Sequence, residues 1–179
     1  MGHLGTAQSL HSKSTHRPKD KTDKYLAFQL SQEDYGIEVS NVREIIGVQD
    51  ITAVPHTPVY VKGVFNLRGK VVPVMDLRLK LGLEEAAHTS STCIIVVESK
   101  RAGGSLTGVI VDGVSEVITA IASEIEPPPD FGSKVCVSHV CGLAKMKGKV
   151  KILLDIEGIL GTNGNLAAEE VVGAKGVQS

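Results

Sequence analysis

The sequence predicts a mainly β protein made of two related halves, and three observations support this prediction. First, the segment 63–78 recurs seventy-nine positions later, beginning at Gly142. Second, an upstream segment beginning at Tyr35 recurs seventy-two positions later, beginning at Thr107. Third, the apolar residues form short alternating runs between turn residues, as strands do. Two repeats in the same order indicate two copies of one structural unit.

The positions that match between the two copies include turn glycines and aspartates. The downstream matches pair Val61, Gly63, Gly69, Lys70, Val71, Asp76, Leu81 and Gly82 with Val140, Gly142, Gly148, Lys149, Val150, Asp155, Leu160 and Gly161. The upstream matches pair Gly36, Val39, Val42, Glu44 and Ile46 with Gly108, Val111, Val114, Glu116 and Ile118. The copies differ at Asn66-Leu67-Arg68, which aligns with Lys145-Met146-Lys147. We expect recognition where the copies differ.

Within each half, the pattern predicts about five short strands. Residues 25–30 and 35–39 form a hairpin, and residues 42–46 form either a helical turn or a further strand. The continuous apolar run 94–97 is typical of a strand buried on both faces. Pro73 interrupts another strand and cannot donate to a ladder, which favours an edge or a bulge.

We expect each half to close into a small barrel, because closure removes exposed sheet edges. The two barrels would span residues 25–82 and 93–161 and share an apolar seam. Residues 1–24 are predicted to be a disordered tail, and residues 162–179 a second tail that is partly helical.

Composition limits the function. The chain has 179 residues, of which 42% are hydrophobic and only 3% aromatic, so the core is built from Val, Ile and Leu. A net charge of −1 argues against nucleic-acid binding, which needs a basic face. No apolar run is long enough to span a membrane. Three cysteines without a secretion signal indicate reduced thiols in the cytoplasm.

Two groups of residues are candidates for chemical sites. Asp76 and Asp155 could be paired catalytic carboxylates, but their equivalent repeat positions favour a capping role at the turns that follow. Zinc at Cys136, His139 and Cys141 is disfavoured, because structural zinc normally takes four well-spaced ligands. Cys93 is expected to behave as a small apolar residue. We therefore predict no catalytic site, no metal and no cofactor.

Arg68 stands out because it lies in a turn between Asn66 and Gly69, where a long side chain projects into solvent. It could be a solvated charge, a structural ion pair with Glu44, or a contact residue for a partner. An exposed ion pair contributes only about 0.2–1 kcal/mol to stability, so stability alone is a weak reason for an arginine here. Arginine is enriched at the centres of interfaces.

The ordered motifs resemble those of the CheW family of chemotaxis coupling proteins. The resemblance covers residues 25–160 and leaves only the tails. Its motifs are Tyr35-Gly36-Ile37, Val42-Arg43-Glu44-Ile45, residues 61–69, residues 72–78, Val111-Asp112-Gly113-Val114, residues 125–129 and Ile152-Leu153-Leu154-Asp155. Each motif is weak alone, but the whole series in order is specific.

The resemblance implies two packed five-stranded SH3-like β-barrels with short helices, and no catalysis. It implies a cytoplasmic adaptor, recruited to membrane-associated arrays without inserting into the membrane. Its partners would be methyl-accepting chemoreceptors, whose cytoplasmic tips it links to the histidine kinase CheA, and the regulatory domain of CheA has the same fold. The implied receptor-facing groove is lined by Val42, Glu44, Ile45, Gly63, Asn66, Arg68, Val111 and Val114. Kinase contacts are expected at the outer ends of the barrels, without assigned residues.

Alternatives of other classes make different demands on the residues. A small enzyme would need Asp76, Asp112 and Asp155 to converge in one pocket. An oligonucleotide-binding barrel would need stacking aromatic residues and a basic groove, which this sequence lacks. Within the resembling family, the domain also occurs fused to a receiver domain, as in CheV, or at the end of CheA. Neither a receiver nor an ATP-binding domain fits in the residues after Gly161.

Overall fold

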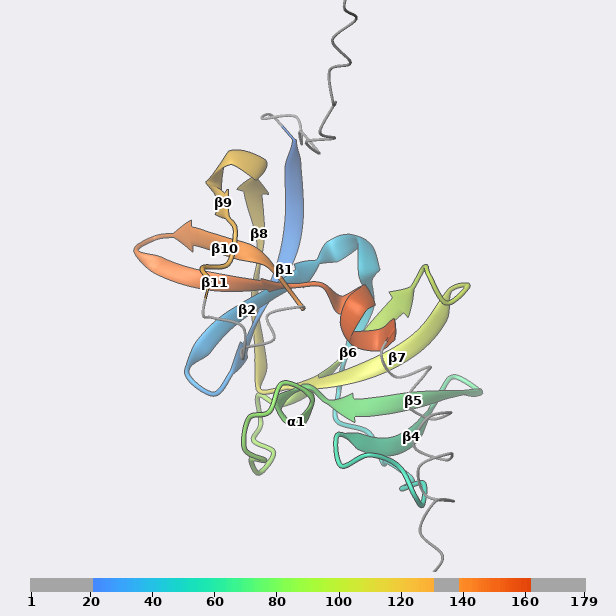
Figure 1. The fold of residues 1–179 in the computed structure, drawn as a ribbon. Helices are drawn as coiled ribbons and strands as arrows, with labels where there is room; N and C mark the ends of the chain where they lie inside the picture. Colours follow the sequence, from blue (N-terminus) through green and yellow to red (C-terminus); the bar gives the residue numbers. More distant parts are fainter. Residues whose placement is uncertain (1–20, 131–138, 162–179) are drawn as a thin grey trace, which may run out of the picture.

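The computed structural model of the chain describes residues 21–130 and 139–161 and is mainly β, as predicted. Its strands form one six-stranded and one five-stranded sheet, which pack together (Figure 1). The strands are β1 (Thr22–Leu30), β2 (Glu33–Glu38), β3 (Val42–Gly47), β4 (Val61–Leu67), β5 (Lys70–Asp76), β6 (Cys93–Ser99), β7 (Ser105–Val111), β8 (Gly113–Ile121), β9 (Ile125–Glu126), β10 (Val140–Met146) and β11 (Lys149–Leu154). The helical elements are η1 (Val39–Asn41), α1 (Leu77–Lys80), η2 (Ala122–Glu124) and a turn of helix at residues 156–161.

The two predicted tails lie partly or wholly outside the described residues. Strand β1 begins at Thr22, so the tail predicted for residues 1–24 is too long by its last residues. The remainder of that tail, and the partly helical tail predicted for residues 162–179, lie outside the described residues. Residues 42–46, which the sequence left open, belong to strand β3.

Each sheet takes strands from both halves of the chain. The strand order is β8-β1-β2-β11-β10-β9 in one sheet and β3-β6-β7-β5-β4 in the other. The hairpin β1–β2 of the first half therefore joins the strands of the second half, and β6–β7 of the second half joins those of the first. The expectation that residues 25–82 and 93–161 each build their own barrel is corrected accordingly, because the leading hairpins of the two halves change places.

The internal repeat is visible in the geometry of the sheets. The five strands β8-β1-β2-β11-β10 have the same order as β3-β6-β7-β5-β4, and each set contains one parallel pair, β2 with β11 or β7 with β5. The pairing register shifts between Val61 and Gly63 in β4, and between Val140 and Gly142 in β10. The repeat seen in the sequence is thus a repeat of bulges and pairings as well as of residues.

The sheets are curled but not closed as barrels. In the five-stranded sheet the edges are β3 and β4, and the chain that leaves β3 returns to form an isolated bridge between Thr52 and Val64. Two backbone hydrogen bonds of 2.8 and 2.9 Å hold this bridge. Gly63 beside it has φ +139°, and a Cβ there would lie 2.0 Å from the Thr52 carbonyl oxygen. Only glycine permits so close an approach.

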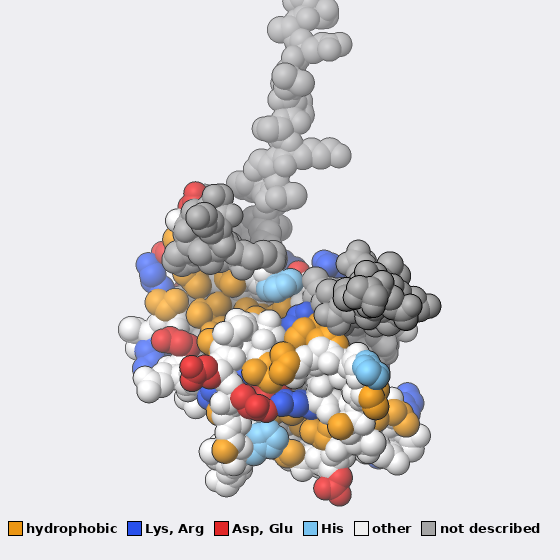
Figure 2. All heavy atoms as spheres, turned by 60° about the horizontal axis from the view of Figure 1, so that its bottom comes forward, with side chains coloured by type: hydrophobic (Ala, Val, Ile, Leu, Met, Phe, Trp, Pro, Cys, Tyr) orange, Lys and Arg blue, Asp and Glu red, His pale blue; other side chains and the backbone are white. Residues whose placement is uncertain are grey.

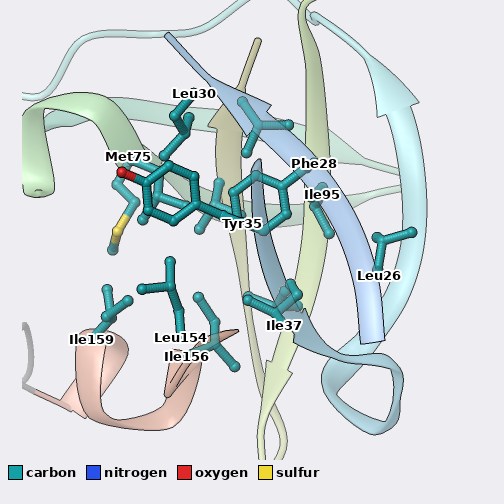
Figure 3. Close-up of a cluster of buried hydrophobic side chains, with 14 of the residues drawn as sticks. Leu26, Phe28, Leu30, Tyr35, Ile37, Met75, Ile95, Leu154, Ile156 and Ile159 are labelled. Carbon is teal, nitrogen blue, oxygen red and sulfur yellow. The ribbon is translucent and has the colours of Figure 1, made fainter. Parts of the chain in front are cut away.

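Three hydrophobic clusters hold the fold together. One lies inside each curled sheet, around Phe65 in the five-stranded sheet and around Ala27 in the six-stranded sheet. The third and largest lies at the seam between the sheets, where Phe28 stacks on Tyr35 with ring centroids 6.0 Å apart (Figure 3). Its members come from both halves of the chain, so the shared apolar seam predicted from the sequence is confirmed.

Strand β6 contributes side chains to two of these clusters, one on each of its faces. Ile94 and Val96 point into the cluster of the five-stranded sheet, whereas Ile95 and Val97 point into the seam. All four are fully buried, as predicted from the continuous apolar run. Burying one such side chain contributes about 1.5–3 kcal/mol, so this strand ties the sheet to the seam.

The two short helices that end the halves are fixed by charged side chains. In α1, the Asp76 carboxylate accepts a hydrogen bond from the Leu79 amide at 3.3 Å, which confirms the predicted cap. Arg78 then forms a bidentate ion pair with Asp112, which also accepts from the Ser31 amide at 2.7 Å. Partial burial alone would raise the pKa of Asp112, but these hydrogen bonds outweigh it and leave that pKa below its ordinary value.

Glu157 takes the place of Arg78 in the second copy and fixes the helix at residues 156–161. Its carboxylate accepts from the Ser99 hydroxyl at 2.7 Å, the Lys100 amide at 2.7 Å and the Asn41 side chain at 3.1 Å. Burial alone would raise the pKa of Glu157, yet the hydrogen bonds from the Ser99 hydroxyl and the Lys100 amide lower it below the ordinary value. Each terminal helix is thus locked to a hairpin turn.

Candidate functional site

The structure brings together Glu44 and Arg68, the two charged residues singled out in the sequence. Glu44 lies on β3 and Arg68 in the turn between β4 and β5, and their side chains form an ion pair. The Arg68 side chain is 74% exposed and that of Glu44 27% exposed. Because β3 and β4 are the two edges of the five-stranded sheet, the ion pair spans the opening between its edges.

The turn that carries Arg68 is built by its neighbours. Arg68 has φ +49° and Gly69 has φ +88°, so two successive residues adopt left-handed backbone. The Asn66 side chain accepts a hydrogen bond from the Gly69 amide at 2.7 Å and stabilises this turn. Asn66 therefore positions Arg68 as well as being exposed itself.

A shallow cavity of about 400 Å³ adjoins the ion pair. Its lining residues are Arg43, Glu44, Leu67, Arg68, Lys70, Gly104 and Leu106. Arg43 is held by an ion pair with Glu98 at 2.6 Å. Arg43 and Lys70 were not singled out from the sequence, although both flank motif residues. This surface combines three basic side chains with apolar ones.

The apolar candidates on β3 face the seam instead. Val42 and Ile45 pair with Val97 and Ile95, whose side chains belong to the seam cluster. Ile45 remains 45% exposed, while Val42 is partly buried against the cluster. Side chains alternate along a strand, so Glu44 points to the opposite face from Ile45. The candidates on β3 therefore occupy both faces of one edge strand.

Two predicted groove residues are not available on the surface. Val111 is only 1% exposed and packs in the seam cluster, and Gly63 is buried against the Thr52 backbone. Their placement in an open groove is therefore wrong, and substitutions there would act through the fold. Val114 is partly buried at the edge of the seam cluster.

The second copy carries a counterpart of the Glu44–Arg68 site. Glu116 and Lys147 occupy the equivalent positions, with Lys147 Nζ 4.0 Å from Glu116 Oε2 and φ +51° at Lys147. Beside them is a cavity of about 660 Å³ that includes Lys151, whose side chain is 8% exposed. Lys151 Nζ lies 3.4 Å from Asp34 Oδ2. The repeat offset of seventy-nine aligns this buried lysine with the apolar residue Val72. A lysine at the position of a core residue is a signal that the sequence interpretation missed.

The residues weighed as chemical sites have structural contacts. Asp76 caps α1, Asp112 pairs with Arg78, and Asp155 lies before the last helix with its carboxylate beside Gly158. Burial raises the pKa of the Cys93 thiol, consistent with a small packing residue. Within residues 21–130 and 139–161, no three His, Cys, Asp or Glu side chains gather as a metal site. Cys136, one of the three residues at which zinc was disfavoured, lies outside those residues.

On the face turned forward in Figure 2, apolar side chains are interspersed with acidic and basic ones. No helix in the described part of the chain is long and apolar enough to cross a membrane. Two curled sheets with repeated charged edges and a common core define a small β module of the SH3-like kind, with two surfaces of related design.

Comparison with known proteins assigns this module to a family. A family model for the CheW-like domain matches residues 24–163, and the chain belongs to that family. It is 38% identical over 136 residues to the chemotaxis protein CheW of Klebsiella aerogenes, covering 76% of this chain and 80% of the relative. It is 34% identical over 138 residues to CheW of Bacillus subtilis, covering 77% of this chain and 86% of the relative.

A solved structure agrees with this assignment. The scaffolding protein TtCheW from Thermoanaerobacter tengcongensis superposes with a TM-score of 0.71 at 35% sequence identity. The match covers 80% of this chain and 96% of that one. The fold expected from the sequence resemblance, two packed β units with short helices, is therefore confirmed, with the correction that the sheets are not closed.

Proposed function

We propose that this chain is a chemotaxis adaptor that couples the cytoplasmic tips of chemoreceptors to the histidine kinase CheA without catalysing a reaction. The observation that carries the proposal is the Glu44–Arg68 surface on a chain that belongs to the CheW-like family. The proposal also draws on relatives that are named as chemotaxis proteins and on a similar structure described as a scaffolding protein. The adaptor would act in the cytoplasm at receptor arrays.

The receptor is proposed to bind along β3 as a helical hairpin. Among the strands of residues 21–130 and 139–161, β3 pairs with β6 alone, so its other edge has no strand partner there. A helix lying along this edge would contact Ile45 and Val42 on the face of β3 toward the seam. On the opposite face of β3 it would contact Glu44 and Arg68. Apolar contacts would supply contact area, and the ion pair would set the orientation of the helix.

Arg68 is proposed to gain a new partner when the receptor binds. Its side chain is 74% exposed in the free protein, so the ion pair with Glu44 contributes little to stability. At the centre of an interface, the same arginine would lose its water and could donate to receptor carboxylates or carbonyls. Selection for contact, more than for stability, accounts for an arginine at this position.

The kinase is proposed to bind at the outer ends of the two sheets. The repeat places exposed apolar residues at equivalent positions in the two units, Val71 at 73% and Val150 at 45% exposure. Val71 pairs with Asn66 beside Arg68, so the Val150 end, in the other sheet, is the one that would let the chain hold a kinase while its receptor surface is occupied. Each contact can be weak, because many copies in an array raise the effective concentration of the partners.

A titration with matched variants tests the receptor surface. The cytoplasmic signalling fragment of a chemoreceptor is titrated against the full chain, the Arg68→Ala variant and the Lys147→Ala variant. We expect Arg68→Ala to weaken binding about 5–30-fold, the effect of losing 1–2 kcal/mol, and Lys147→Ala to leave it unchanged. Lys147 is a suitable control because it has the same left-handed backbone and is 88% exposed.

The two variants also separate binding from folding, because both remove a mostly exposed side chain and should melt like the parent chain. Unchanged affinity of the Arg68→Ala variant would show that Arg68 is not a receptor contact. Equal weakening by both variants would show a general effect of surface charge.

A further inference from the structure

The interior of the six-stranded sheet contains a lysine where the equivalent position of the five-stranded sheet is apolar. Ala144 on β10 lies directly opposite Lys151 on β11. The repeat aligns these two residues with Phe65 and Val72, which lie opposite each other on β4 and β5. Phe65 and Val72 fill the interior of the first unit, whereas the small Ala144 leaves room for the aliphatic part of the lysine. Lys151 is therefore part of the interior of the second unit.

Asp34, the ion-pair partner of Lys151, also stands in place of an apolar residue. It lies opposite Lys151 in the parallel pairing of β11 with β2, and the repeat aligns it with Leu106. The first unit has no pairing at these positions, because Pro73 has no N–H to donate and β5 pairs with β7 only from Val74 onward. Since β5 lies between β7 and β4, the sheet edge predicted at Pro73 is wrong. The charged pair of the second unit thus has no counterpart in the first.

The ammonium group of Lys151 is buried, but the protein satisfies only part of its hydrogen-bonding capacity. The side chain is 8% exposed, and Nζ donates a long hydrogen bond of 3.4 Å to Asp34 Oδ2. Glu116 Oε1 lies 3.8 Å away, beyond hydrogen-bonding distance. An ammonium has three N–H donors, and among the described residues only Asp34 accepts from this one. Replacing a buried ion pair by apolar residues is often neutral or stabilising, so stability does not account for this lysine.

The cavity of about 660 Å³ that Lys151 lines, here called the Lys151 cavity, has the size of a small-ligand site. Lys149 lines it too and lies on the same face of β11 as Lys151, because side chains alternate along a strand. Within residues 21–130 and 139–161, Lys149 has no ion-pair partner. Two lysines with unused donors therefore line one cavity.

The other charged residues of the Lys151 cavity have contacts of their own. Lys145 pairs with Glu126 at 2.8 Å, and Glu124 accepts from the Ile121 amide at 3.3 Å. Glu116 lies between two lysines, 3.8 Å from Lys151 and 4.0 Å from Lys147. In all, four lysines and three acidic residues line the cavity, which leaves an excess of one positive charge. An incoming anion would be bound by Lys149 and Lys151.

The remaining lining of the cavity includes apolar side chains. Ile118 is almost fully buried, and Met146 packs against the cluster inside the six-stranded sheet. Val117 is 56% exposed beside them. A ligand that joins one anionic group to an apolar stem matches both parts of the lining. A carboxylate, with a single negative charge, matches the single excess positive charge better than a phosphate dianion does.

We propose that the Lys151 cavity binds a carboxylate carried on an apolar stem. Lys151 and Lys149 donate to the carboxylate oxygens, and Met146 and Ile118 contact the stem. A free carboxylic acid and a glutamate side chain between apolar residues of a protein segment both present this chemistry. The cavity belongs to the other sheet from the receptor surface, and its test needs no receptor or kinase, so the inference does not rest on the proposed function.

A titration followed by amide chemical shifts tests the site. Hexanoate is added to the isotope-labelled full chain, and hexanamide, which has the same stem without the charge, is the matched control ligand. We expect hexanoate to shift the amides of residues 116–118 and 149–152, and hexanamide to leave them unchanged. A short peptide with one glutamate between leucines is titrated in parallel. Tighter binding of the peptide identifies a protein segment as the source of the carboxylate, and tighter binding of hexanoate identifies a free acid.

Variants assign the effect to the two lysines. The double variant Lys151→Val/Asp34→Leu copies the first unit and should weaken binding at least about tenfold, and Lys149→Ala should weaken it about 3–10-fold. Lys149 is exposed, so its variant gives a test that does not depend on the stability of the double variant. Lys70→Ala is the matched control, because the repeat aligns the exposed Lys70 with Lys149, and it should leave binding unchanged.

Three results would overturn the proposal. The first is equal binding of hexanoate and hexanamide, which would show that the charge is not recognised. The second is binding at parent strength by the double variant or by Lys149→Ala. The third is an absence of binding by both hexanoate and the peptide.

Discussion

The substitution Gly63→Ala should be among the most damaging single changes in this protein. A methyl group at this position would lie 2.0 Å from the Thr52 carbonyl oxygen, and its backbone has φ +139°. Alanine in such a conformation costs about 1–3 kcal/mol. The clash would also break the Thr52–Val64 bridge, whose two hydrogen bonds of 2.8 and 2.9 Å contribute about 0.5–1.5 kcal/mol each.

The sum is a loss of roughly 2–6 kcal/mol of unfolding free energy. For a chain of 179 residues, each kcal/mol lowers Tm by about 2–4 °C, so thermal unfolding should move down by roughly 10 °C. Gly69→Ala is the matched control, because Gly69 has φ +88° but open space around a Cβ. It should cost only about 1 kcal/mol. If both variants melt at the same temperature, the close approach to Thr52 does not stabilise the fold.

Two further predictions concern charged groups inside the fold. Asp112→Asn should cost about 1.5–3 kcal/mol, because it weakens the charged hydrogen bonds of Arg78. Since the folded pKa of Asp112 is depressed, its stabilisation is complete above the ordinary pKa and is lost as pH falls below about 4. Urea unfolding from pH 7 to pH 3 should therefore show a shallower acid loss in Asp112→Asn, and parallel curves would contradict this. Lys151→Val should lower the free energy of unfolding by about 3 kcal/mol, because it leaves the Asp34 carboxylate unpaired. The double variant Lys151→Val/Asp34→Leu copies the equivalent apolar residues Val72 and Leu106 and should recover stability in urea unfolding. A double variant no more stable than the single one would show that the pair is not the cause.

The sequence predicts the content of this fold well because the repeat is strong. Bulges and pairings recur at positions that the offsets align, and the apolar run 94–97 indicates a strand buried on both faces. Asp76 could be assigned as a cap because its equivalent in the second copy made a catalytic role less plausible. These features depend on local chemistry, which a single sequence contains.

The exchange of hairpins between the units could not be predicted from the repeat. The two leading hairpins, β1–β2 and β6–β7, present equivalent edges for strand pairing. The repeat offsets in the sequence are therefore the same whether β1–β2 pairs with strands of the first half or of the second half. The choice depends on the seam cluster, whose members are far apart in sequence. The same cluster decides that Val111 is buried, although its sequence context fits a groove residue equally well.

For the site, the sequence offered the Glu44–Arg68 ion pair as one of three roles for Arg68 and did not indicate its surroundings. A polar residue in an apolar run and an arginine in a glycine-flanked turn are local signals, and the structure joins them. Arg43 and Lys70 reach the same cavity through the curl of the sheet, which is a tertiary property. Lys151 was missed because a lysine is ordinarily expected at the surface.

The central claim is that this chain joins a receptor to a kinase, and co-sedimentation tests it most directly. Receptor signalling fragments assembled on vesicles are incubated with CheA, with and without the full chain, and the kinase in the pellet is measured. The adaptor account predicts that CheA sediments with the receptors only when the chain is present, and that Arg68→Ala reduces this while Lys147→Ala does not. A chain that sediments with neither partner, or kinase recovery that is the same without it, would contradict the account.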